Sequence, residues 1–166
     1  IDSASGDIIA GMDLNFTNCS ITTSSGDVVL EVLAAQQVTV TTTSGDVELG
    51  VLTAEQIAVN TTRGDVEQGD LTAEQITVNT SSGDVTARGL EGDNEISTQS
   101  GDVEIDSCSG DMDISTSSGD IFLEDINGKL SISTLSGYVR AEKINGSAKI
   151  ETSSGDVGLR FSALTG

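Results

Sequence analysis

Residues 114–123 read Ile-Ser-Thr-Ser-Ser-Gly-Asp-Ile-Phe-Leu, and variants of this stretch recur along the whole chain. Eight of the variants contain Gly-Asp, and Gly137-Tyr138 stands where a ninth is expected. The glycines of these slots follow one another at steps of 18 to 20 residues. Self-similarity at a fixed period is typical of repeat architectures. The eight dipeptides begin at Gly6, Gly26, Gly45, Gly64, Gly83, Gly101, Gly119 and Gly155.

Apolar and polar residues alternate on both sides of each of these glycines. The second residue after the glycine and the fifth before it are always Val or Ile. Alternation with a period of two indicates half-buried strands rather than helices. A unit of this length cannot bury its own apolar face, but stacked units share one core. The sequence therefore predicts an all-β, single-stranded β-solenoid (β-helix). Its coils of 18–20 residues each hold two short strands in stacked parallel sheets. Residues 1–166 form one domain of about eight to nine coils.

Tandem Ser-Gly-Asp-Val units, each preceded by an Ile-x-Thr strand, resemble the bacterial adhesin-like β-solenoid repeat domains of unknown function. The resemblance covers residues 1 to 166 and implies an exported or membrane-attached rod. Some similar domains belong to envelope-stress systems. The resemblance defines no catalytic residues. Because the chain begins at Ile1 rather than Met, we expect a fragment of a longer exported protein. We expect it to be extracellular or at the cell surface, attached through parts outside this sequence.

The composition excludes several classes of function. The chain has 27 acidic and 7 basic residues, a net charge of -20 and no His. Such a charge opposes binding to nucleic acid, which is a polyanion. No apolar run approaches about 18 residues, so no transmembrane segment is expected. Coils of nearly equal length leave no loop to wall an active site, and aromatic residues are scarce. We expect no enzyme activity and no cofactor.

The charge is distributed unevenly along the predicted rod. Residues 63–125 hold 16 acidic and 2 basic residues, whereas residues 126–166 hold 3 acidic and 5 basic ones. Alternation places Asp102, Glu104 and Asp106 on one outer face, and Asp111 and Asp113 on the opposite one. The acidic trio is a candidate site for a cationic partner. The basic end is the alternative working surface, and solubility alone explains the charge equally well.

The rare aromatic residues mark a second candidate site. Tyr138 replaces the aspartate of its Gly-Asp slot, and Phe122 stands at an outward position. Arg140 follows one coil later in the same column as Phe122, within reach of a cation–π contact. These three residues either receive a partner or pack under a segment outside this sequence.

The aspartates after the repeated glycines form a predicted column with a spacing of about 4.8 Å. Oxygen ligands of this kind suit Ca²⁺. Calcium-binding nonapeptide solenoids, however, need Gly-Gly-x-Gly-x-Asp, and the chain has no Gly-Gly pair. We therefore expect turn caps rather than a metal site. The column comprises Asp27, Asp46, Asp65, Asp84, Asp102 and Asp120 among others.

The sequence thus leads to a non-enzymatic cell-surface β-solenoid that acts as an adhesin, a binding module or a spacer. The alternative is a sensory or regulatory domain of an envelope-stress system that binds cationic peptides or an envelope protein. The partner is expected to be a protein, peptide or carbohydrate of the cell envelope, and exposed sheet edges would permit end-to-end self-association. Cys19 and Cys108 lie about five coils apart, beyond disulfide reach, and are predicted to be unbonded and mostly buried.

Overall fold

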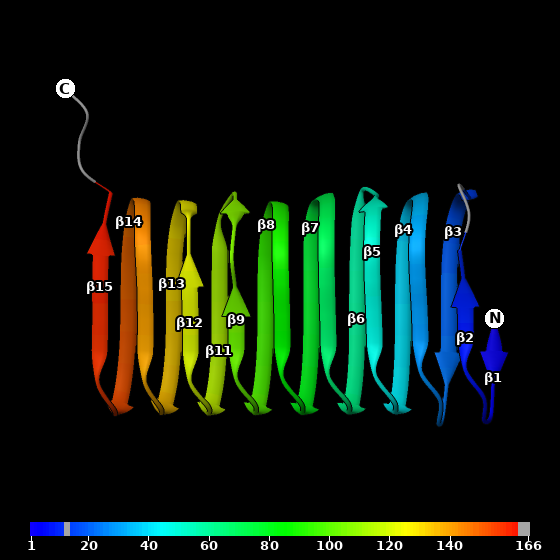
Figure 1. Cartoon of the computed structure of the whole chain (residues 1–166), viewed down its shortest axis with the longest axis horizontal. Helices are drawn as coiled ribbons and strands as arrows, with labels where there is room; N and C mark the ends of the chain where they lie inside the picture. Colours follow the sequence, from blue (N-terminus) through cyan, green and yellow to red (C-terminus); the bar gives the residue numbers. More distant parts are fainter. Residues whose placement is uncertain (12–13, 163–166) are drawn as a thin grey trace.

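The chain folds as a straight stack of coils, as Figure 1 shows. The computed structural model describes residues 1–11 and 14–162. The first coil lies at one end of the rod and the last at the other, with the strands perpendicular to its long axis (Figure 1). The predicted all-β parallel solenoid is confirmed, with a repeat of about 18 residues and about nine turns.

Fifteen strands make up the described chain. The first five are β1 (Asp2–Ser3), β2 (Ile8–Ala10), β3 (Leu14–Thr23), β4 (Val28–Ser44) and β5 (Val47–Thr53). The next five are β6 (Gln56–Arg63), β7 (Val66–Ser82), β8 (Val85–Ser100), β9 (Val103–Ile105) and β10 (Cys108–Ser109). The last five are β11 (Met112–Ser118), β12 (Ile121–Glu124), β13 (Ile126–Ser136), β14 (Val139–Ser154) and β15 (Val157–Phe161).

The coils stack in the register that the repeat predicts. Ile114 of β11 pairs with Ile96 in β8 and with Ile132 in β13, and both pairings are parallel. Each column therefore stacks equivalent residues of successive coils. In β4, β7, β8 and β14 the strand continues through the second corner of the coil, so its two arms are one bent strand. Other coils are divided into shorter strands: β5 and β6 form one coil, and β9, β10 and β11 form another.

Val, Ile and Leu fill the interior of the rod. The column two residues after the glycine is buried from Ile8 to Val139. The same column is exposed at Val157, as is Leu159 beside it, and Ile1 is exposed at the other end. These residues lie in the first and last described coils, which have a described neighbour on one side only. Like-on-like stacking of β-branched side chains suits this regular interior.

The sharp corner at each repeated Gly-Asp slot depends on glycine. Gly119 has a φ of 137°, a conformation that L side chains rarely adopt. A Cβ at this position would also overlap the carbonyl oxygen of Gly101 in the preceding coil. The equivalent glycines from Gly26 to Gly155 stack in the same way, whereas a Cβ at Gly6 in the first coil would meet no atom. Close backbone approach and positive φ together explain why every slot keeps its glycine.

The threonine column three residues before the glycine points inward, as the alternation predicts. The hydroxyls of Thr23, Thr116 and Thr134 donate to the carbonyl oxygen two residues later, at 3.2, 3.3 and 3.0 Å. In these coils the hydroxyls therefore satisfy carbonyl groups at the corner. In the middle coils the buried hydroxyl has no hydrogen-bond partner in the structure. The four residues concerned are Thr42, Thr61, Thr80 and Thr98.

Candidate acidic binding face

One long side of the rod carries a long series of exposed carboxylates. We call it the acidic face. It consists of the outward side chains of the arm that follows each repeated glycine, and it runs from strand β4 to strand β14. One column of this face pairs Glu48 with Glu67, and further along it Glu104 with Phe122 and Phe122 with Arg140. The exposed carboxylates of the face are Asp27, Glu31, Asp46, Glu48, Asp65, Glu67, Asp84, Asp102, Glu104, Asp106 and Glu124.

The aspartates after the glycines form a hydrogen-bonded ladder along one border of the acidic face. Oδ1 of Asp84 accepts the backbone N–H of Asp102 at 2.8 Å, and Oδ1 of Asp102 accepts that of Asp120 at 2.7 Å. The same contact joins every coil from Asp7 to Tyr138. The sequence predicts that each aspartate caps its own turn, but in the structure it bonds the equivalent turn of the next coil instead. One carboxylate oxygen of each residue is engaged in this way.

No metal site emerges from the residues that can be described. Across residues 1–11 and 14–162, no group of three or more Asp, Glu, Cys or His side chains is arranged to hold a metal ion. The spare oxygens of the ladder remain at the surface, where water solvates them. The geometry therefore gives the ladder a structural role, which the sequence interpretation as turn caps favoured.

A shallow groove lies on the acidic face where it passes over strands β9, β12 and β14. Its volume is about 220 Å³. Glu104, Phe122 and Arg140 are successive members of one column in it, and Asp106 and Glu124 belong to the next column. The structure therefore brings together two sets of residues that the sequence treated as rival sites. The acidic trio and the aromatic residues share one surface.

Phe122 and Tyr138 form an aromatic pair at the edge of this groove. Their ring centroids lie 6.1 Å apart and the ring planes are tilted by 54°. Such a separation and tilt fall within the range that aromatic pairs prefer. Tyr138 extends toward Gly158 of the next coil, where an added Cβ would lie 3.3 Å from the tyrosine hydroxyl. Because glycine has no side chain, Gly158 leaves room for the ring of Tyr138 to lie along the surface.

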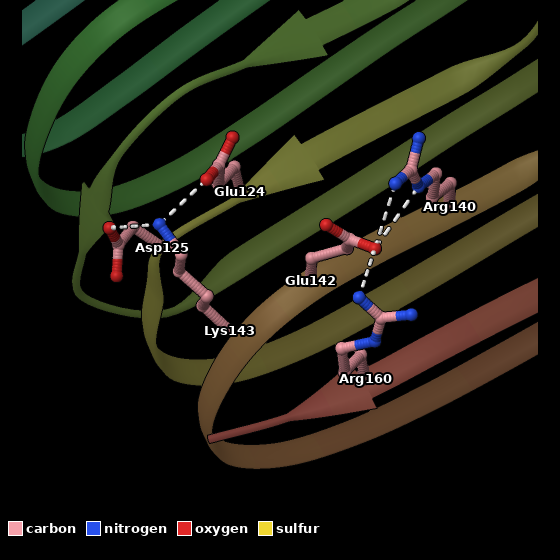
Figure 2. Close-up of polar contacts among 6 residues, drawn as sticks. All are labelled: Glu124, Asp125, Arg140, Glu142, Lys143 and Arg160. Atoms are coloured by element: carbon pink, nitrogen blue, oxygen red, sulfur yellow. Dashed lines mark hydrogen bonds and ion pairs between the residues drawn. The ribbon is translucent and has the colours of Figure 1, made fainter. Parts of the chain in front are cut away.

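The basic side chains beside the groove form ion pairs with carboxylates of the protein itself, as Figure 2 shows. Arg140 donates from Nε and Nη2 to Oε1 of Glu142, at 3.2 and 2.9 Å. Arg160 lies 3.3 Å from the same oxygen. Lys143 lies 2.7 Å from Glu124 and 3.6 Å from Asp125 (Figure 2). The basic end of the rod is therefore largely neutralised by its own carboxylates.

These contacts shift the ionisation of the paired groups. The hydrogen bond from Arg140 lowers the pKa of Glu142, and the hydrogen bond to Glu142 raises the pKa of Arg140. The hydrogen bond to Glu124 raises the pKa of Lys143. All three shifts favour the charged forms, so the network is intact at neutral pH.

The cation–π contact considered for Arg140 and Phe122 is replaced by contacts of each residue with another partner. The two residues are adjacent in their column, as predicted. The guanidinium, however, hydrogen-bonds Glu142 two residues along its own strand, and the ring pairs with Tyr138. A carboxylate within reach is the stronger attraction for an exposed guanidinium. The sequence showed the column but not the diagonal contact between Phe122 and Tyr138.

The opposite face of the rod differs in composition. Asp111 and Asp113 lie there, exposed, as the alternation predicts, together with Asp93 and Glu95. Asp111 accepts the backbone N–H of Lys129 at 3.0 Å. Before these coils the same face is lined by neutral side chains, and Asn79 donates to Asn60 at 3.1 Å in an amide ladder. The acids of this face form a local patch within a largely neutral surface.

The cysteines are free, as predicted. Cys108 is buried, and burial raises the pKa of its thiol to about 11. Cys19 is only partly buried, and burial raises its thiol pKa as well. The expectation that both are mostly buried is therefore confirmed for Cys108 alone.

Within the described residues, no helix is long and apolar enough to cross a membrane.

Comparison with protein families shows that the chain matches a family model described as Toastrack DUF4097. It matches residues 1–91 and residues 54–165, and so spans nearly the whole chain. The match confirms the resemblance at the level of a β-solenoid repeat family of unknown function. Comparison with curated proteins and with solved structures gives no match.

Proposed function

Because this chain belongs to the Toastrack DUF4097 family of β-solenoid repeat modules, we propose that it is a non-enzymatic binding module of the bacterial cell surface. The acidic face is its working surface, and its partner carries positive charge. The rod holds this face at a distance from whatever anchors it, in the manner of a surface adhesin. The domain contributes recognition and reach rather than chemistry.

The observation that supports this proposal most is the state of the carboxylates on the acidic face. Asp102, Glu104 and Asp106 are exposed, and in the described part of the chain none of them forms an ion pair. Asp102 stacks between Asp84 and Asp120, and carboxylates about 4.8 Å apart repel one another by about 1 kcal/mol per pair, even at the dielectric constant of water. A cationic partner would relieve this repulsion and would be drawn to the face over a distance.

The second candidate function is the sensing of cationic peptides in an envelope-stress system. The same acidic face supports it, because a sensor for such peptides needs a polyanionic surface. The two proposals differ in the consequence of binding, which is attachment in one case and signalling in the other. The genes beside this one discriminate between them, since regulators favour sensing and anchoring signals favour attachment.

The test uses a fluorescent, lysine-rich peptide and two variants that each remove three negative charges. The first carries Asp102→Asn, Glu104→Gln and Asp106→Asn on the acidic face. The matched control carries Glu95→Gln, Asp111→Asn and Asp113→Asn on the opposite face. Each set includes one aspartate that accepts a backbone N–H from the next coil, and asparagine keeps that acceptor.

We expect anisotropy titrations to show clearly weaker binding for the acidic-face variant only. Binding of the parent protein should also weaken as the salt concentration rises, since the Debye length falls from about 10 Å at 0.1 M to about 3 Å at 1 M. Equal losses in both variants would indicate attraction by net charge and would refute a working face. No loss in either would leave the rod a spacer.

A further inference from the structure

We propose that the groove beside Phe122 is a subsite for a single arginine or lysine side chain of a basic peptide, with the Phe122–Tyr138 pair as its apolar wall. This inference rests on the proposed function and assigns it to particular residues. The acidic face attracts the peptide, and the groove selects a segment that places a cation beside the aromatic rings.

The first support is the arrangement of rings and carboxylates. Phe122 is half-buried and lines the groove, with Glu104 next to it in its own column and Asp106 and Glu124 in the neighbouring column. A long basic side chain combines an apolar stem with a charged head. The stem would pack against the rings, and the head would reach the carboxylates. A cation over an aromatic face gains further electrostatic attraction.

The second support is that the protein's own cations leave this position open. Arg140 is the neighbour of Phe122 in the column, but its guanidinium is held by Glu142. Lys143 is held by Glu124 and Asp125. Glu104 and Asp106, on the other side of the ring, form no ion pair among the described residues. The uncompensated charge of the groove is therefore negative, and it complements a basic side chain.

The third support is the break in the aspartate ladder at Tyr138. Tyr138 donates its backbone N–H to Asp120 at 2.8 Å, but its own side chain has no carboxylate to accept the N–H of Asp156. The repeat therefore gives up one interstrand contact to place a ring on the surface. Departures from an otherwise consistent pattern are expected at functional sites.

The experiment measures the affinity of a Gly-Ser peptide that carries several arginines, with a citrulline version as the uncharged control. Tyr138→Asp restores the residue that the other repeats have in this slot, and Phe122→Thr copies Thr86 of the same column. We expect each substitution to weaken binding by about two- to fivefold, the value of an exposed cation–π contact. Tyr138→Phe keeps the ring and should retain the affinity of the parent.

The sign of the Tyr138→Asp result is decisive, because this change adds a negative charge. Attraction by charge alone predicts tighter binding, whereas the groove predicts weaker binding. Unchanged or tighter binding in Tyr138→Asp and in Phe122→Thr would overturn the subsite and leave the acidic face as proposed. If citrulline peptide binds as well as arginine peptide, the groove does not select a cation and the subsite is again refuted. If the triple variant Asp102→Asn, Glu104→Gln, Asp106→Asn also binds as the parent does, the proposed function fails with it.

Discussion

Replacing Gln68 with leucine should stabilise the protein. Gln68 is fully buried, and neither the oxygen nor the nitrogen of its side-chain amide has a hydrogen-bond partner. Its neighbours in the column are Leu49 and Ala87, both of which are buried. A buried polar group without a partner costs about 1–3 kcal/mol. Because leucine has a similar size and no polar atoms, Gln68→Leu should raise the free energy of unfolding by about 1–3 kcal/mol.

The assay is equilibrium unfolding in urea, followed by far-UV circular dichroism. The matched control is Ile105→Gln, which introduces the same amide two coils later in the same column, between Ala87 and Leu123, and should destabilise by at least about 3 kcal/mol. Comparable m-values are required before the free energies are compared, because repeat proteins can lose cooperativity. If Gln68→Leu leaves the midpoint unchanged or lowers it, the amide is satisfied in solution and the reasoning is wrong.

Three further predictions concern the corner glycines, the buried thiol and the aspartate ladder. Gly119→Ala should destabilise the protein by at least about 2 kcal/mol, since φ is positive there and the added methyl group meets Gly101. Thermal unfolding checks this with Gly158→Ala as the control variant. Equal melting temperatures of the two variants would contradict the prediction. Burial raises the pKa of the Cys108 thiol from 9.0 to about 11, so its contribution to stability should be complete below pH 9 and should decline as the pH rises toward 11. The Cys108→Val variant should lack this part of the decline. Identical stability–pH profiles for the two proteins would disprove the assignment. Chelation of divalent ions should not change the melting temperature, because the ladder aspartates accept backbone N–H groups; a large drop would indicate a structural metal array.

Much of the fold could be predicted from the sequence because the repeat fixes both the period and the alternation. Once the glycines are aligned, the columns of Val, Ile and Thr identify the inside of every coil. The ends of the rod were harder, since burial there depends on a neighbouring coil and not on residue type. Val157 fits the pattern of Val139 yet is exposed, because its coil is covered from one described side only. Continuous strands through the second corner also depend on backbone geometry that alternation does not encode.

The candidate site was predicted only as separate parts. Alternation correctly assigned Asp102, Glu104 and Asp106 to one face, and the column register placed Phe122 beside Arg140. Contacts between columns were not predictable, because they depend on rotamers and on competing partners. The contact between Tyr138 and Phe122 was therefore not predicted, nor was the pairing of Arg140 with Glu142 instead of with the Phe122 ring. For the same reason, the sequence did not show that Glu104 and Asp106 line one groove together with Phe122 and Arg140.

The most direct test of a cationic partner on the acidic face is an amide NMR titration of the labelled protein with the lysine-rich peptide. The largest chemical-shift changes should fall on strands β9, β12 and β14, around Glu104 and Phe122, and should decrease as salt is added. Changes centred on Glu95 and Asp113 of the opposite face, or no saturable changes at low salt, would contradict it.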